Sequence, residues 1–387
     1  MKYIIALAFI YGVIFAAVSQ ENDSSNYNRP FQASVFYPLG TNGLESPKYT
    51  NNVSFNLFYG LNGGLKGIEF GGLVNSNLGK VQGAQFAGIA NINADKVNGA
   101  MFSGITNIAK DSSIIIAAAG ISNVLGNSSY GLLAAGISNT TNGDFSGGQF
   151  AGITNQNNGA FIGGQFAGIT NVNNGDMTGF QAAGISNINA GHLTGAQIGL
   201  INRSKKVTGA QIGLVNISDS IKGVPIGLIN YVRQGYHSFE FYGSESIYAN
   251  INFKLGVEKL YTIYKVGYFN NNGENYLTYG LGWGSMTSIN DRIKLSLDLS
   301  ANHIVQHNNN PDLDLLAKGD LNFRFVLNKY IDLFVGPSFN TYVAEYDVDS
   351  EAPLLNVPYT FYETDWWNGN GSTSIWIGAN AGLGIRF

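Results

Sequence analysis

Two pairs of side chains near the C-terminus have the chemistry to bind a metal ion. His303 and His307 stand four residues apart, and Asp312 and Asp314 follow them in the same predicted external loop. Imidazole nitrogens and carboxylate oxygens are ligands for divalent metals. A loop has no helical spacing that would bring these groups to one point, so solvated loop residues are the competing interpretation. We predict no metal site and no cofactor.

A second predicted loop combines carboxylates with two indole rings. Its acidic residues are Glu345, Asp347, Asp349 and Glu351. Their oxygens could hold Ca²⁺, although an exposed hydrophilic loop would have the same composition. Trp366 and Trp367 lie near the end of this loop, where they would stack on sugar rings or lie in a lipid interface. Both tryptophans are candidate binding residues.

Most enzyme and nucleic-acid-binding classes find no support in the sequence. The chain of 387 residues has no Cys, which excludes disulfides and thiolate chemistry. A nucleophile elbow, a phosphate-binding loop and an HExxH motif are all missing. The net charge of -4 comes without a basic patch for phosphates, so nucleic acid is not an expected partner. We predict a protein that is not an enzyme; a barrel enzyme with rim residues such as His303 and His307 is the weaker alternative.

Long alternating runs occupy the chain from residue 237 onward. In one of them Ile293, Leu295 and Leu297 share a face, and Lys294 and Ser296 share the other. Period-2 alternation over such lengths is typical of strands that cross an outer membrane. We predict eight strands, at 237–244, 247–256, 259–269, 276–286, 292–303, 315–327, 331–343 and 375–387.

The polar face of these strands carries charges of both signs. They are Lys254, Lys265, Lys294, Asp298, Lys318, Asp320, Arg324, Asp332 and Arg386. An eight-stranded barrel is just wide enough for its own side chains, and buried charges must be paired. A barrel plugged by salt bridges is therefore expected, with a narrow polar pore as the alternative.

A repeat fills residues 64–231 and resembles the phrase Q-F-A-G-I-x-N. Its Asn recurs eleven times, in steps of 16 residues that shorten to 15 and 14. Gly always stands three places earlier, and Ile or Leu two places earlier. Such a period indicates stacked units. A parallel β-solenoid, with one unit per coil, would stack identical residues; an antiparallel meander would not. The unbroken columns favour the solenoid, and the meander stays open.

Two columns of the repeat have predicted roles. The first is a structural ladder in which each Asn amide bonds the next, as in cross-β structures. Its members include Gly88, Asn91, Gly104, Asn107, Gly152, Asn155, Gly168 and Asn171. The second column is aromatic and includes Phe86, Phe102, Phe150 and Phe166. If the Ile column lines the core, simple alternation turns these rings outward as a binding surface. A bulge or corner would instead turn both columns inward.

The N-terminal segments complete the domain organisation. Residues 1–19 have a basic start, an apolar run and a small-residue exit, which predict a cleaved secretory signal peptide. We expect a flexible lead-in at 20–30 and a β-hairpin at 31–63 that either caps the array or adds two strands to the barrel, making ten. The barrel domain would then comprise residues 232–387.

Two features resemble bacterial outer-membrane β-barrel proteins with Gly/Asn-rich surface repeats. The chain ends on Gly384-Ile385-Arg386-Phe387, and its repeats contain G-A-Q-F-A-G-I and G-A-Q-I-G-L-V-N. The resemblance covers most of the mature chain. It implies an outer-membrane location, lipid as a partner, and Phe387 as the signal read by the barrel-assembly machinery.

The sequence therefore predicts an all-β outer-membrane protein with a barrel anchor and a repetitive solenoid. Its expected role is structural or adhesive, toward a surface or periplasmic partner that the sequence does not name. A channel in which the repeats form barrel strands or a plug is the alternative. Counting strands back from Phe387 places the array on the periplasmic side, whereas the likeness to surface repeats suggests the outside.

Overall fold

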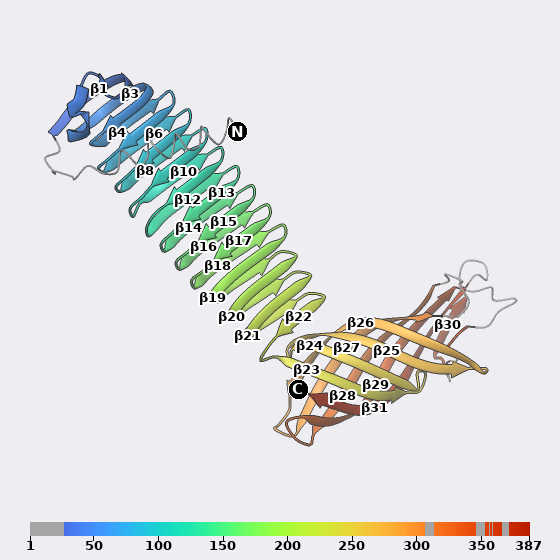
Figure 1. Ribbon diagram of the computed structural model, residues 1–387. Helices are drawn as coiled ribbons and strands as arrows, with labels where there is room; N and C mark the ends of the chain where they lie inside the picture. Colours follow the sequence, from blue (N-terminus) through green and yellow to red (C-terminus); the bar gives the residue numbers. More distant parts are fainter. Residues whose placement is uncertain (1–26, 306–312, 346–352, 356, 358, 366–370) are drawn as a thin grey trace. The chain divides into compact units, whose positions relative to one another are not determined.

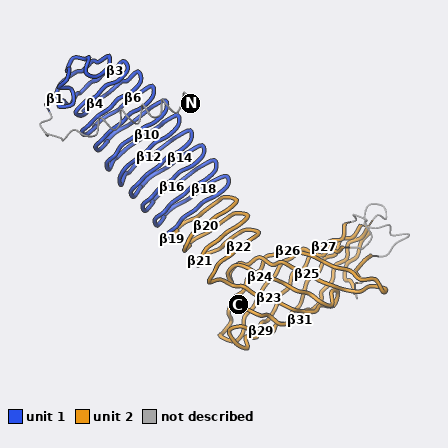
Figure 2. The backbone as a smooth tube through the Cα atoms, in the orientation of Figure 1, with its two compact units in different colours: residues 1–192 blue, residues 193–387 orange. Residues whose placement is uncertain are grey.

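The computed structural model describes residues 27–305, 313–345, 353–355, 357, 359–365 and 371–387. It is all-β, with a parallel β-solenoid of about 11 turns followed by a closed eight-stranded antiparallel β-barrel. The chain separates into two compact units, residues 1–192 and 193–387 (Figures 1 and 2). Among the described residues, no helix is long and apolar enough to span a membrane. The predicted fold class is confirmed.

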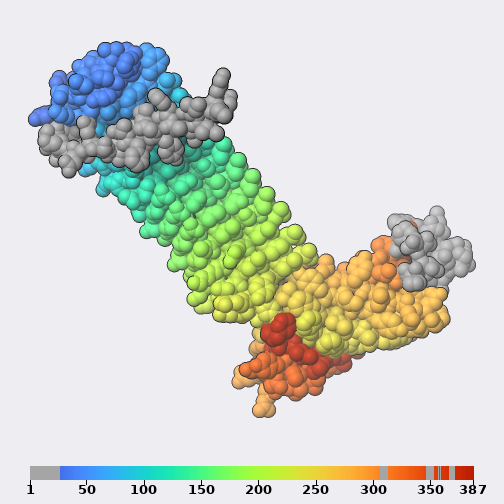
Figure 3. All heavy atoms as spheres, viewed as in Figure 1, coloured from blue at the N-terminus to red at the C-terminus, as the bar shows by residue number. Residues whose placement is uncertain are grey.

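Each full coil of unit 1 contains one long and one short strand. The long strands are β4 (Gly64–Gly71), β6 (Val81–Ala87), β8 (Val97–Ser103), β10 (Ile114–Ala119), β12 (Ser129–Ala135), β14 (Phe145–Ala151), β16 (Phe161–Ala167) and β18 (Met177–Ala183). The short strands are β5 (Val74–Asn77), β7 (Ala90–Asn93), β9 (Thr106–Ala109), β11 (Ser122–Leu125), β13 (Ser138–Thr141), β15 (Thr154–Asn157) and β17 (Thr170–Asn173). Figure 3 shows the coils as evenly spaced ridges.

The coils stack in parallel and in register. Phe150 pairs with Phe166, and Asn155 with Asn171, one period further along the chain. Every residue therefore lies beside its own equivalent in the neighbouring coils. The antiparallel meander is wrong for this array, because its neighbouring strands would run in opposite directions.

The first strands differ from the prediction. β1 (Tyr27–Phe36) pairs in parallel with β3 (Tyr49–Asn62), and a two-residue strand β2 (Leu39–Gly40) and a 3-10 helix η1 (Gly43–Lys48) lie between them. Parallel pairing excludes the expected hairpin and the ten-stranded barrel, since β3 also pairs with β4 and β5 of the array. β1 begins inside the segment predicted as a lead-in. The predicted signal peptide lies outside the described residues.

Shorter periods produce longer strands in the last coils. β19 (Ser186–Ile198), β20 (Ile201–Ile212) and β21 (Val215–Ile226) each join a short and a long strand without an interruption. The loss of turn residues explains this: Asn173-Asn174-Gly175 in one coil becomes Ser204-Lys205-Lys206 in a later one. β22 (Ile229–Val232) ends the array.

Eight antiparallel strands close the barrel. They are β23 (Tyr236–Ser244), β24 (Ala249–Val257), β25 (Leu260–Asn271), β26 (Glu274–Ser288), β27 (Ile293–Val305), β28 (Asp314–Val326), β29 (Ile331–Glu345) and β31 (Gly371–Arg386). Pairing of β23 with β31 completes the ring, and β30 (Tyr362–Asp365) adds to one end of β31. The predicted strands lie within a few residues of the observed ones.

The two ends of the barrel differ in the length of their connections. At one end the strands are joined through residues 258–259, 289–292 and 327–330, and the chain both enters and ends there. We call this the short-turn end. The opposite, long-loop end includes the connection 346–370 between β29 and β31.

Candidate functional site

The Asn ladder predicted from the repeat is present and buried. Asn155 Nδ2 donates to Asn171 Oδ1 at 2.9 Å and to the Phe166 carbonyl oxygen at 2.8 Å. Asn75, Asn91 and the later members repeat the amide-to-amide bond, and the column is at most 1% exposed. Because an amide both donates and accepts, each copy satisfies the next.

The Gly that stands three places before each ladder Asn allows the backbones of neighbouring coils to lie close together. A Cβ atom on Gly104 would lie 2.2 Å from the Gly88 carbonyl oxygen, and one on Gly152 would lie 2.1 Å from the Gly136 carbonyl oxygen. A Cβ atom on Gly168 would likewise lie 2.1 Å from the Gly152 carbonyl oxygen. The repeated Gly is therefore required by close backbone contact between coils.

A buried Gln column lies beside the Asn ladder and was not predicted. Gln181 Nε2 donates to Gln165 Oε1 at 2.7 Å, and Gln165 Nε2 donates to Gln149 Oε1 at 2.8 Å. The Gln of the phrase Q-F-A-G-I-x-N recurs as regularly as its Asn over these coils. That periodicity could have identified the column.

Glu69 occupies a Gln position and is a buried carboxylate that accepts hydrogen bonds from four amide side chains. Its Oε1 accepts from Asn56 at 2.9 Å and Asn62 at 2.7 Å, and its Oε2 from Asn77 at 2.7 Å and Gln85 at 2.8 Å. Burial raises the pKa of Glu69, and these amide donors oppose the rise.

The aromatic column points outward. Phe86, Phe102, Phe150 and Phe166 are 36%, 37%, 46% and 38% exposed, and the rings of Phe150 and Phe166 stack at 5.1 Å. The premise that the Ile column lines the core is wrong, because Ile153 and its equivalents are also exposed. The alternative with both columns inward is therefore wrong too. Amides occupy much of the interior instead.

The barrel interior contains a chain of ion pairs. Lys254 Nζ lies 2.8 Å from Glu240 Oε1 and 2.6 Å from Asp298 Oδ2. Arg324 Nη2 lies 2.6 Å from Glu240 Oε1 and 2.7 Å from Asp332 Oδ1. All five side chains are at most 5% exposed. This is the plugged, salt-bridged interior expected from the sequence.

The ion-pair chain extends toward both ends of the barrel. Arg386 Nε lies 2.8 Å from Asp332 Oδ2, and Lys294 pairs with Glu258 at the short-turn end. Lys265 lies 3.6 Å from Asp320. Lys318, also predicted to face inward, is buried. All nine predicted inward charges thus face the lumen.

Apolar clusters close the lumen on either side of the ion pairs. At the long-loop end, Trp376, Tyr342 and Phe269 pack together with Leu355 from the connection between β29 and β31. Tyr236, Tyr261, Ile263 and Met286 form a second cluster near the short-turn end. An open polar pore is therefore inconsistent with the described interior.

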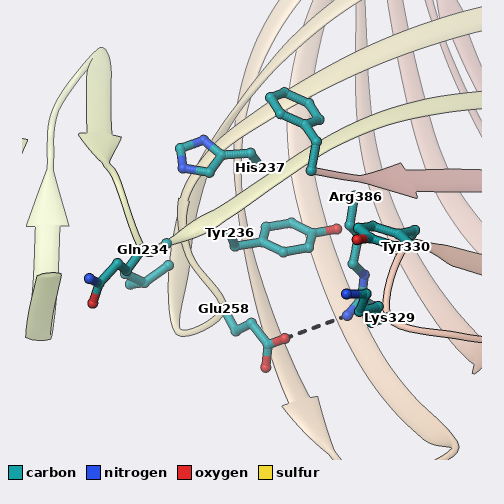
Figure 4. A pocket seen from close by; sticks show the side chains of 10 residues that line it. Gln234, Tyr236, His237, Glu258, Lys329, Tyr330 and Arg386 are labelled. Carbon is teal, nitrogen blue, oxygen red and sulfur yellow. Dashed lines mark ion pairs between the residues drawn. The ribbon is translucent and has the colours of Figure 1, made fainter. Parts of the chain in front are cut away.

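A shallow cavity of about 380 Å³ opens at the short-turn end (Figure 4). Glu258 faces Arg386 there, with 3.8 Å between Oε1 and Nη1, and the Lys329 ammonium lies 4.6 Å from the centre of the Tyr330 ring. The charged groups of this mouth are thus engaged with one another, and we assign it no ligand.

Within unit 2, the last coil is bonded to the barrel wall. Asn230, the final ladder member, donates from Nδ2 to Thr262 Oγ1 at 2.8 Å. The Thr262 hydroxyl donates to the Gly227 carbonyl oxygen at 3.1 Å, and the Tyr264 hydroxyl donates to the Leu228 carbonyl oxygen at 2.6 Å. A barrel strand therefore terminates the Asn ladder, and this coil is not a loosely tethered element.

The candidate loop sites lie only partly within the described residues. His303 lies in β27, and its Nδ1 is 3.1 Å from the Asp314 carbonyl oxygen rather than from a carboxylate. Several candidates lie outside the described residues: His307, Asp312, Asp347, Asp349, Glu351, Trp366 and Trp367. In the described part of the chain, no three His, Cys, Asp or Glu side chains form a group suited to a metal ion.

Comparisons with known proteins supply no relative. No protein-family model matches the chain, and neither a curated protein nor a solved structure matches it.

Proposed function

We propose that the barrel anchors this protein in a bacterial outer membrane and that the solenoid is its scaffold for contacts. The supporting observation is that the outer wall of the barrel is apolar and its interior is charged. Leu297, Leu299 and Trp283 are 48%, 57% and 53% exposed on the outside, while Lys254 and Arg324 are fully buried inside. A lipid-facing apolar band around a polar interior is typical of transmembrane barrels.

Membrane insertion is tested by reconstituting the purified full chain into phospholipid vesicles. We expect it to float with lipid in a density gradient and to resist extraction by alkaline carbonate. The barrel should also migrate faster on a gel before heating than after, because a folded barrel is compact. Recovery of a soluble monomer after detergent removal would contradict the anchor.

The function is proposed to be structural or adhesive and not enzymatic or conductive. The ion pairs and the two apolar clusters fill the described lumen. In planar bilayers the protein should give no conductance steps, with a porin in the same bilayer as the positive control. Stable steps from the purified protein would support the channel instead.

We further infer that the array lies on the periplasmic side. It joins the barrel at the short-turn end, where Phe387 also lies, and short turns face the periplasm in bacterial barrels. Lys205 and Lys206 are exposed in the array and provide trypsin sites. We expect cleavage there only after the outer membrane is permeabilised.

An epitope inserted in the connection 306–312, at the opposite end, is the matched control and should be detected on intact cells. Cleavage of the array in intact cells, with that epitope hidden, would reverse the orientation and leave the anchor intact.

A further inference from the structure

The outward side of the long strands in unit 1 is an uncharged apolar sheet face. In β12 the outward residues are Tyr130, Leu132 and Ala134, and in-register pairing repeats these three positions as columns from β8 to β18. None of the residues in these columns is charged. The most exposed are Ile114 61%, Tyr130 60%, Ile162 57%, Ile116 53%, Leu132 49% and Phe150 46%. We call this surface the long-strand face.

The other sides of the same coils are more polar. The first residue of every short strand from β9 to β17, and of β19, is Thr or Ser. The turns before the long strands expose Asp144 and Asp176. The outward column of Tyr130 also becomes polar in the first coils, where it holds Lys66 and Gln82. The long-strand face is therefore a bounded apolar surface, and a contiguous apolar surface of this kind is typical of a contact site.

The long-strand face is large enough for a stable interface. Six coils about 4.8 Å apart, with strands of seven residues as in β12, cover roughly 650 Å² on one copy. A face-to-face pair would bury about twice that area, which lies within the range of about 1,200–2,000 Å² for specific interfaces. A sheet face that stacks on a second, equivalent face also follows the ordinary packing of two sheets.

The order of large and small residues fits a second copy of the same face. A two-fold axis along the strand direction, between β12 and β14, places β12 against β14, β10 against β16 and β8 against β18 of the second copy. In the column of Leu132 the facing pairs are then Leu132–Gly148, Ile116–Gly164 and Ala100–Phe180. In the column of Ala134 they are Ala134–Phe150, Ala118–Phe166 and Phe102–Ala182. Every pair of these two columns joins a large residue to a small one, as interdigitating sheets require.

The remaining column contributes a groove. Its facing pairs are Tyr130–Ser146, Asn98–Thr178 and Ile114–Ile162, and only the last joins two large side chains. Tyr130, Ser146 and Ile162 line a groove of about 550 Å³. The Tyr130 ring of one copy therefore lies opposite the part of the groove that Ser146 leaves open in the other.

We propose that two copies of this chain pair through the long-strand face of unit 1, with their solenoids antiparallel. A second copy is thus a partner of the solenoid. This pairing rests on the proposed role of the solenoid as a scaffold for contacts and does not rest on the membrane anchor.

The pairing is tested with Leu132→Glu in the full chain, placed in lipid nanodiscs that hold one barrel each. Sedimentation over a dilution series measures the dissociation constant of the dimer. Two carboxylates buried beside the two-fold axis should raise it about a hundredfold or more. Ile162→Glu is a second variant of the face and should act in the same direction. Thr140→Glu, on the short strand of the same coil as Leu132, is the matched control and should change it less than about twofold.

The outcomes separate the pairing from the anchor. A parent chain that stays monomeric at micromolar concentration, or equal effects of Leu132→Glu and Thr140→Glu, would overturn the pairing and leave the anchor intact. Protein that does not enter nanodiscs would contradict the anchor, and the same dilution series on the soluble chain then measures the pairing.

The antiparallel order is tested with single thiols, since the chain has no Cys. Ile116→Cys and Gly164→Cys chains are mixed and treated with a bismaleimide that spans the roughly 10 Å between packed sheets. The mixture should give covalent dimers, whereas Ile116→Cys alone should not, because its two copies are offset by three coils, about 14 Å along the stack. Self-crosslinking of Ile116→Cys without the mixed product would overturn the antiparallel order.

A lipid surface is the competing occupant of the long-strand face. In that case the parent would be monomeric, and a fluorophore on Ile162→Cys would be quenched by nitroxide-labelled lipid in vesicles. This combination would overturn the pairing. An unquenched probe together with the mixed crosslink is the result expected for the dimer.

Discussion

The solenoid and the barrel both bury polar groups in their interiors, but with different chemistry. Much of the solenoid interior is built from neutral amides, with Asn155 bonded to Asn171 and Gln165 to Gln149. The barrel interior is built from charges, with Arg324 between Glu240 and Asp332. The difference follows from how each sheet places its residues.

Parallel, in-register stacking puts each residue next to its own copy. A column of identical charges would repel, whereas a column of identical amides is self-complementary because each amide donates and accepts. Closure of the barrel brings side chains of different strands together across the lumen, so Lys254 of β24 can meet Asp298 of β27. In-register stacking therefore favours amides in one interior, and contact across a lumen allows ion pairs in the other.

Glu69 is a carboxylate within this amide interior, and its neighbours explain why a carboxylate is tolerated there. It is one carboxylate in a position otherwise filled mostly by Gln, and its neighbour in the next coil is the amide of Gln85 at 2.8 Å. Four amide donors can satisfy one carboxylate. Two stacked carboxylates would have no such solution.

The largest effect is expected in the barrel, for Arg324→Ala. This change leaves Glu240 and Asp332 buried with fewer partners and should lower the free energy of unfolding by about 3–5 kcal/mol. Urea unfolding in lipid or detergent, followed by gel mobility, measures it. The control Arg233→Ala removes an exposed pair with Asp219 and should cost about 0–1 kcal/mol. Equal losses would mean that the interior pairs do not stabilise the barrel.

The second-largest effect is expected for Asn155→Ala, in the amide interior of the solenoid. It removes one of the acceptors of the Asn139 amide and the donor to Asn171 Oδ1, at a cost of about 2–3 kcal/mol. Hydrogen exchange of peptides from this coil measures the local opening free energy. Asn158→Ala alters an exposed amide of the same coil and should stay within about 0.5 kcal/mol of the parent. A ladder mutant as stable as this control would refute the role of the buried bonds.

Coil spacing is tested by Gly152→Ala. The new Cβ would lie 2.1 Å from the Gly136 carbonyl oxygen, so the two coils must separate, at about 1–3 kcal/mol. Local hydrogen exchange around β14 and β15 should accelerate. Gly164→Ala is the control, since Ala84 and Ala100 already occupy the equivalent outward position. If both variants exchange alike, close approach is not what the Gly column provides.

The smallest effect concerns pH and Glu69. Because burial raises its pKa, the folded state holds this proton more tightly than the unfolded chain. Stability of the first coils is therefore full below the ordinary pKa of Glu and declines as pH rises through the raised value, by at most about 1.4 kcal/mol per pH unit for one proton. Hydrogen exchange across that window measures the slope, which should vanish in Glu69→Gln. A slope of opposite sign would mean that the four amide donors outweigh burial.

The barrel was predictable because its signal is local. Runs such as Ile293–Val305 alternate without interruption, so each strand and its inward face could be assigned from residue types alone. The charges Lys254 and Asp298 were expected inside for the same reason. The partner of each charge could not be predicted, because it depends on which side chains face one another across the closed lumen.

The solenoid was only partly predictable. Its period implied stacked coils and an Asn ladder, but the assignment of faces failed. Phe166 and Ile169 are separated by the corner at Gly168. Because the chain bends there, alternation counted through the corner no longer predicts which way a side chain points. The expectation that Ile lies inside also failed, because the alternative interior of stacked amides has no signature in a single repeat.

The sequence by itself determined the period and the alternating barrel strands, because spacing and alternation are properties of residue order, and it favoured parallel stacking without excluding the meander. Only the tertiary structure decided which columns face outward, how the charges pair and how Asn230 ends its ladder on Thr262. Those features depend on corners, on register and on groups that meet only when distant segments pack. An amide column becomes a stable interior only once neighbouring coils supply its hydrogen bonds.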